Sequence, residues 1–144
     1  MNNSKQKAFF KFSLIIAFII GASNLVFSHG KIGTKTSKFL ILVETTEDGV
    51  KLTSQEGCAW KELTFTLNIE KPQAVDQFGM ASLNQDKPTE DKSLANFLFT
   101  IKKTKDGISL DGKGGTAWTK LNFGCDKGKC YQYIDFNGMV PRKD

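Results

Sequence analysis

FLILVETTEDGVKLTSQEGCAWKELTF, residues 39–65, decides the fold, because the chain repeats it at 97–123 as FLFTIKKTKDGISLDGKGGTAWTKLNF. The two copies align without a gap at an offset of 58 residues, and 11 of the 27 positions are identical. A shorter match follows: DQFGM at 76–80 corresponds to DFNGM at 135–139, at an offset of 59 residues. Self-similarity on this scale indicates an internal duplication of one structural unit.

The start of each copy predicts a β-hairpin. Along 39–46 a strand would point Phe39, Ile41 and Val43 one way and Leu40, Leu42 and Glu44 the other, and its β-branched and aromatic residues favour this conformation. Asp48-Gly49 then predicts a two-residue type I′ turn, with Val43 facing Ser54 across the hairpin. Asp106-Gly107 predicts the same two-residue turn in the second copy. The residues expected on one apolar face of the first hairpin are Phe39, Ile41, Val43, Val50 and Leu52.

Two further strands are expected in each copy. Apolar alternation predicts a third strand after Trp60 and after Trp118, and a glycine three residues before each Trp predicts a tight entry. The segments 73–78 and 131–136 are expected to form a fourth strand. Residues 81–96 are polar and contain Pro88, which is typical of a linker.

We therefore predict an all-β fold of about eight antiparallel strands. Two tandem four-stranded repeats, at 39–80 and 97–140, would form one domain that is a sandwich or a barrel. Each repeat has an apolar face that one sheet leaves unburied, so the repeats are expected to share a core. A chain of two separate cores is the alternative, although about 42 residues are few for independent folding.

Trp60 and Trp118 are the candidate binding residues. An exposed indole pair would provide a platform for a partner, for instance a surface glycan. Alternatively, each Trp is the largest core residue of its repeat, because each lies between apolar strands.

The first 28 residues have the pattern of a signal peptide that directs export. Lys5, Lys7 and Lys11 precede a short apolar run at 13–22, which is briefer than the roughly 20 residues of a membrane span. We expect cleavage after Ser28, a polar leader at 29–38 and a periplasmic, cell-surface or secreted location. A retained segment would be the chain's only membrane attachment. His29 would become the N-terminus, but a copper brace needs a second histidine and the chain has one.

The charge of the mature part argues against nucleic acid as a partner. The chain carries a formal +5, but three lysines and no acidic residue lie in the signal segment, which leaves +2 after cleavage. A domain whose net charge is this close to zero has no strongly basic surface that would attract a phosphate backbone.

The three cysteines have separate roles. Cys125 and Cys130 flank a four-residue loop and are expected to form a disulfide, which suits an exported protein. Cys58 remains, and we interpret it as a buried free thiol beside Trp60. Neither a redox pair nor a metal site has the required spacing or ligands.

No catalytic residues, metal or cofactor are predicted, so an enzyme is not expected. Asp76 and Asp135 occupy matching positions and would form an acid dyad if a pseudo-two-fold axis brought them together. The simpler interpretation is that each carboxylate caps the turn that leads into its own glycine.

The pattern D-G-[VI]-x-L…G-x-A-W-x-x-L-x-F resembles a repeat of small uncharacterised exported proteins of Bacteroidetes-type bacteria. The resemblance spans nearly the whole mature chain and implies export and β structure, with no activity attached. The functional hypothesis is an exported, non-catalytic interaction module with a protein or surface-glycan partner. The alternatives are an inhibitor of an extracellular or periplasmic hydrolase, or a carrier of a small apolar ligand.

Overall fold

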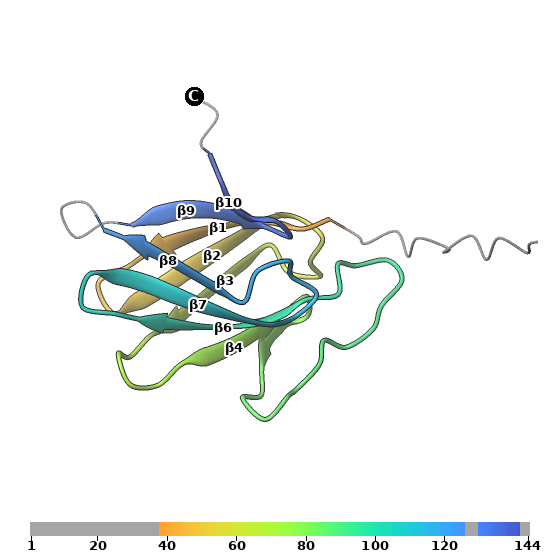
Figure 1. The fold of residues 1–144 in the computed structure, drawn as a ribbon, viewed down its shortest axis with the longest axis horizontal. Coiled ribbons are helices and arrows are strands. Elements are labelled where there is room, and N and C mark those ends of the chain that lie inside the picture. Colours follow the sequence, from red (N-terminus) through yellow and green to blue (C-terminus); the bar gives the residue numbers. More distant parts are fainter. Residues whose placement is uncertain (1–37, 126–129, 142–144) are drawn as a thin grey trace, which may run out of the picture. The chain divides into compact units, whose positions relative to one another are not determined.

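The computed structural model describes residues 38–125 and 130–141, and all regular structure in these ranges is β. Figure 1 shows two layers of strands, coloured in chain order. The predicted signal segment and most of the leader lie outside the described residues. The strands are β1 (Leu40–Thr45), β2 (Gly49–Glu56), β3 (Glu62–Thr66), β4 (Gln73–Asp76), β5 (Gly79–Ala81), β6 (Leu98–Lys103), β7 (Gly107–Gly114), β8 (Lys120–Gly124), β9 (Tyr131–Asp135) and β10 (Gly138–Val140).

The strands form two antiparallel five-stranded sheets packed as a sandwich. Sheet A has the order β10-β9-β1-β2-β3, and sheet B has the order β5-β4-β6-β7-β8. The all-β prediction is confirmed, but the barrel alternative is wrong, because each sheet keeps two open edges. The estimate of four strands per repeat is also wrong. The fifth strands, β5 and β10, are three residues long and form hairpins with β4 and β9, too short to leave a periodic sequence signal.

Each sheet combines strands from both repeats. The hairpin β4–β5 follows β3 in the chain, yet β4 pairs with β6 in sheet B. Its counterpart β9–β10 pairs with β1 in sheet A. The two halves have therefore exchanged their last hairpins, so that each half completes the sheet of the other.

One apolar core lies between the two sheets. Phe39 and Phe97 occupy matching positions, and their ring centroids are 4.6 Å apart at the centre of this core. Phe97 in turn stacks on Phe99 at 5.5 Å. The two repeats share this cluster, as the single-domain prediction expects. Its fully buried members include Phe39, Ile41, Val43, Val50, Leu52, Val75, Phe97, Phe99, Ile101, Ile108, Leu110 and Ile134.

The first hairpin has the predicted apolar face but a different register. Val43 pairs with Leu52, two residues from the predicted partner Ser54, so the turn is Glu47-Asp48 and Gly49 already belongs to β2. The backbone of β3 passes so close to Gly49 that a Cβ there would clash with the carbonyl oxygen of Phe65. A glycine is therefore needed at position 49 because β3 approaches closely, and not because the turn requires a positive φ. A shift of two residues leaves every side chain on its predicted face.

The predicted linker is a loop that connects β5 to β6 (Figure 1, green). Ala95 near its end is 1% exposed, and the side chain of Gln77 donates a hydrogen bond to the carbonyl oxygen of Thr89. Within the described ranges the chain has no helix of the length and apolarity needed to cross a membrane.

Candidate binding groove on the outer face of sheet A

Trp60 and Trp118, the predicted binding residues, are buried at 8% exposure. Each indole N–H donates a hydrogen bond across the sandwich: Trp60 to the carbonyl oxygen of Asp76 at 3.0 Å, and Trp118 to that of Asp135 at 2.9 Å. Gly57 has a positive φ of 86°, and its counterpart in the second copy also has a positive φ. Both glycines therefore form the predicted tight turn before the Trp. The pair therefore joins the sheets as the core alternative expects, and neither ring provides a platform.

Asp76 and Asp135 lie in different sheets, and each carboxylate caps its own turn. Oδ1 of Asp76 accepts hydrogen bonds from the backbone N–H groups of Phe78 and Gly79, at 2.8 and 3.1 Å. Oδ1 of Asp135 makes the same pair of contacts, at 2.7 and 3.0 Å, to the two residues of its turn. The turn-capping interpretation accounts for both residues, and a shared-proton dyad is not formed.

Cys125 and Cys130 form the predicted disulfide, with their Cα atoms 4.3 Å apart. The bond is consistent with an oxidising, extracytoplasmic compartment. Cys58 is free but only half-buried, which corrects the expectation of a buried thiol. Burial nevertheless raises the pKa of the Cys58 thiol to about 11, so the thiolate that a nucleophile needs is scarce at neutral pH.

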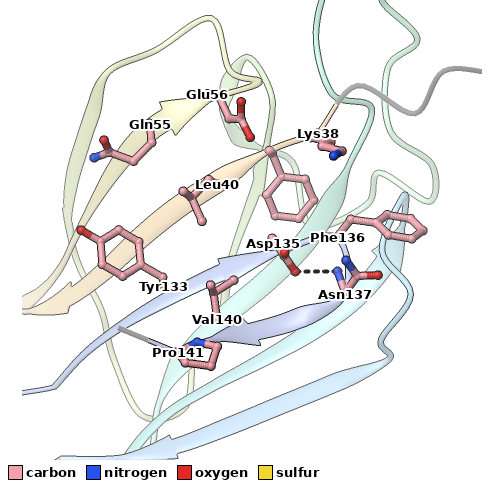
Figure 2. A pocket seen from close by; sticks show the side chains of 11 residues that line it. Lys38, Leu40, Gln55, Glu56, Tyr133, Asp135, Phe136, Asn137, Val140 and Pro141 are labelled. Carbon is pink, nitrogen blue, oxygen red and sulfur yellow. Dashed lines mark hydrogen bonds between the residues drawn. The ribbon is translucent and has the colours of Figure 1, made fainter. Parts of the chain in front are cut away.

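A groove of about 590 Å³ lies on the outer face of sheet A, where β1, β2, β9 and β10 meet (Figure 2). Strand alternation builds it: Ile41 and Ile134 point into the core, so their neighbours Leu40 and Tyr133 point outward. The lining residues are Lys38, Phe39, Leu40, Gln55, Glu56, Tyr133, Asp135, Phe136, Asn137, Val140 and Pro141.

Cross-strand pairing fixes the arrangement of the lining side chains. Leu40 lies opposite Asp135 on β9, and Tyr133 lies opposite Val140 on β10. In Figure 2, Leu40 lies between Glu56, toward the top, and Tyr133 and Val140, toward the lower left, whereas Asp135 lies to the right of Leu40 beside Asn137. The charged side chains of Lys38, Glu56 and Asp135 thus lie on the side of the groove away from Tyr133, which is called the charged end below.

The charged end carries two carboxylates, Glu56 and Asp135, and one ammonium group, Lys38. The capping bonds of Asp135 use Oδ1. Among the residues that the structure describes, its Oδ2 has no partner. The groove can therefore accept hydrogen bonds from a ligand at this end. The described ranges hold no cluster of His, Cys, Asp or Glu side chains suited to a metal ion.

Sheet B has a counterpart of this groove, and the loop between β5 and β6 fills it. Leu98 and Ala74, which match Leu40 and Tyr133 by the repeat offsets, point outward yet are 0% and 2% exposed. Pro88 packs on Gly114, with Cδ 2.8 Å from the place of a Cβ on that glycine. The loop thus covers the outer face of sheet B at Gly114, and the matching place on sheet A is open.

The groove residues were not among the predicted site residues, although the sequence carries a signal for them. At the outward positions where the first repeat has Pro72 and Ala74, the second has Tyr131 and Tyr133. Aromatic side chains on a solvent face, where the matching strand has small ones, indicate a surface used for contact. Interpreting that signal requires knowing which strands lie beside 131–135, and the exchanged hairpins decide this.

Comparisons with family models, with curated proteins and with solved structures gave no match for this chain.

Proposed function

We propose that this chain is an exported, non-catalytic interaction module that binds a polypeptide partner in the groove on sheet A. One observation carries the proposal. The matching place on sheet B is filled by a segment of polypeptide, whereas the groove of about 590 Å³ on sheet A is open. A surface built twice on one scaffold, and covered by peptide in one copy, is suited to peptide in the other.

The chemistry of the groove also favours binding over catalysis. It combines an apolar floor, from Leu40 and Val140, with a few polar groups at one end, which is the usual composition of a ligand site. The described lining residues include no histidine and no cysteine, and Oδ1 of Asp135 serves as a turn cap. The export signal and the disulfide support a location outside the cytoplasm.

The test is a selection of ligands that depend on the groove. A library of random 12-residue peptides and an array of oligosaccharides are probed with the chain and with its Tyr133→Arg variant, whose fold is checked by circular dichroism. Peptides that bind the chain and lose at least tenfold in affinity on the variant support the proposal. Oligosaccharides that show this dependence while peptides do not would replace the polypeptide partner by a glycan. If no ligand depends on Tyr133, the groove is not the binding surface.

A further inference from the structure

Strand β3 is an edge of sheet A and is less protected than the other three sheet edges, β10, β5 and β8. β5 and β10 are only three residues long. β8 has the sequence KLNFG, and asparagine and glycine are both poor strand formers. β3 has the sequence ELTFT without proline or bulge, and its one charged residue, Glu62, forms an ion pair with Lys51 at 3.0 Å. It therefore lacks most of the features by which edge strands avoid pairing with another chain.

The hydrogen bonding of β3 to β2 directs alternate backbone groups of β3 to solvent. Just after the strand, the N–H of Leu67 donates to the carbonyl oxygen of Asp48 at 3.1 Å. In an antiparallel pair, this bond places Glu62, Thr64 and Thr66 at the positions whose N–H and C=O groups point away from β2. No residue of the described ranges forms a hydrogen bond with these groups.

We propose that two copies of the chain pair through β3, antiparallel and about a two-fold axis at Thr64. The outward groups belong to the first, middle and last residues of the strand, so the strand is complementary to itself in this register. Thr64 would lie opposite Thr64 of the second copy, and Glu62 opposite Thr66 of the second copy. Every outward N–H would then meet a carbonyl oxygen. No like charges would face each other, and a Thr–Thr pair across strands is favourable.

An exposed apolar surface beside β3 is an independent observation that points the same way. Cδ2 of Leu63 lies 3.8 Å from the place of a Cβ on Gly79, so the start of β5 borders β3. Met80 on β5 lies opposite the fully buried Val75 and points to the inner side of sheet B, yet Met80 is 61% exposed. Most of the exposed large apolar side chains in the described ranges belong to this part of the chain: Ile69, Phe78, Met80 and Leu83.

This surface favours a second copy of the chain over a short peptide. A peptide added to β3 would extend sheet A alone and leave Met80 exposed to water. A second copy presents β3 and β5 together, so both layers of the sandwich would meet their equivalents and the apolar side chains would be covered. Its β3 is also already formed, which reduces the entropy lost on pairing.

The dimer would hold two grooves on one surface. The two-fold axis between antiparallel strands is perpendicular to the sheet, so the outer faces of both copies of sheet A would lie on the same side. β3 contributes no residue to the groove, so the dimer does not depend on the proposed function, and the two can fail separately. Only the gain from binding two segments of one partner rests on that function.

The test measures the mass of the exported chain by sedimentation equilibrium over a series of concentrations. We expect a reversible dimer. Thr64→Lys would place two ammonium groups opposite each other on the axis and is expected to weaken dimerisation at least tenfold. Thr64 is exposed, so the fold should persist, which circular dichroism checks. Asn122→Lys, the equivalent change on β8, is the matched control and should leave the dimer unchanged.

Cysteine cross-linking tests the register. In the Cys58→Thr background, Thr64→Cys is expected to form an intermolecular disulfide, because the Cα atoms of a hydrogen-bonded antiparallel pair lie about 5.5 Å apart. Glu62→Cys should not cross-link, because the residue expected opposite it is Thr66.

Three results would overturn the inference. The first is a monomer at every concentration. The second is a dimer that Asn122→Lys disrupts and Thr64→Lys does not, which would assign the contact to β8. The third is assemblies larger than a dimer that both changes disrupt, because β3 of one copy would then pair with β8 of the next without a two-fold axis.

Discussion

The outer faces of the two sheets share one scaffold and differ in what lies on them. On sheet B, Leu98 and Ala74 are buried, and a loop contacts the neighbouring Asp76 and Gly114 through Gln85 and Pro88, so this face is part of the folded interior. On sheet A, the matching Leu40 and Tyr133 remain half-buried and line a groove. The two sets of matching strands are therefore alike, whereas one outer face is part of the folded interior and the other holds an open groove.

The largest expected effect comes from separating the halves. Fragments 38–81 and 96–141 are each expected to remain unfolded alone, because β4 and β9 would lose the strands they pair with and Phe39 would lose Phe97. Mixing them should restore β structure, measured by far- and near-ultraviolet circular dichroism. A fragment that folds as a monomer would contradict the shared core on which the comparison depends.

A matched pair of leucines measures the difference between the faces. Leu98→Ala is expected to cost about 2–4 kcal/mol of unfolding free energy, because Leu98 is fully buried beneath the loop. Leu40→Ala should cost about 1 kcal/mol or less, because its side chain is only half-buried in the groove. Denaturant titration of both variants measures the two losses of unfolding free energy. Equal costs would mean that the two faces are equally covered.

Exchanging the residue under Pro88 tests the loop contact directly. Gly114→Glu introduces the side chain of sheet A into sheet B, where a Cβ already meets Cδ of Pro88 at 2.8 Å. We expect a loss of about 1–3 kcal/mol from overpacking, with faster proteolysis of the loop. The reverse change, Glu56→Gly, is the control and should cost about 1 kcal/mol or less. If Gly114→Glu leaves the unfolding free energy unchanged, the loop does not pack on this strand.

The smallest expected effect concerns Cys58 and its counterpart Thr116. Because burial raises the thiol pKa in the folded state, from 9.0 to about 11, the folded protein holds this proton more tightly than the unfolded chain. Stability from this group is therefore complete below about pH 9 and is lost as the pH rises toward 11, by roughly 1–2 kcal/mol.

Lysine and tyrosine side chains also titrate in this range, so Cys58→Thr is the reference for the alkaline measurement. Denaturation of both proteins at pH 8.5 and pH 10.5 isolates the contribution of the thiol. A chain that loses no more stability than Cys58→Thr would show that the thiol is as solvated in the folded state as in the unfolded one.

Local signals in the sequence were sufficient to predict the longer strands and the turns before the tryptophans. The alternation at 39–46 and 97–104 placed the core-facing residues correctly, and the glycines before Trp60 and Trp118 marked tight entries. These properties depend on a strand's period and on the φ available to a glycine, which neighbouring residues determine. The disulfide followed from the short spacing of its cysteines, although the expected hairpin is not formed, because Cys125 follows β8 of sheet B and Cys130 precedes β9 of sheet A.

Long-range pairing determined the rest. The register of the first hairpin depends on how closely β3 approaches Gly49, and the number of strands depends on β5 and β10, which are too short to show a period. Tertiary structure alone placed β4 beside β6 and β9 beside β1, because short strands pair with whichever edge completes a sheet. That exchange decided which strands lie side by side on each outer face. It buried both tryptophans, and it left one outer face covered by the chain and the other open.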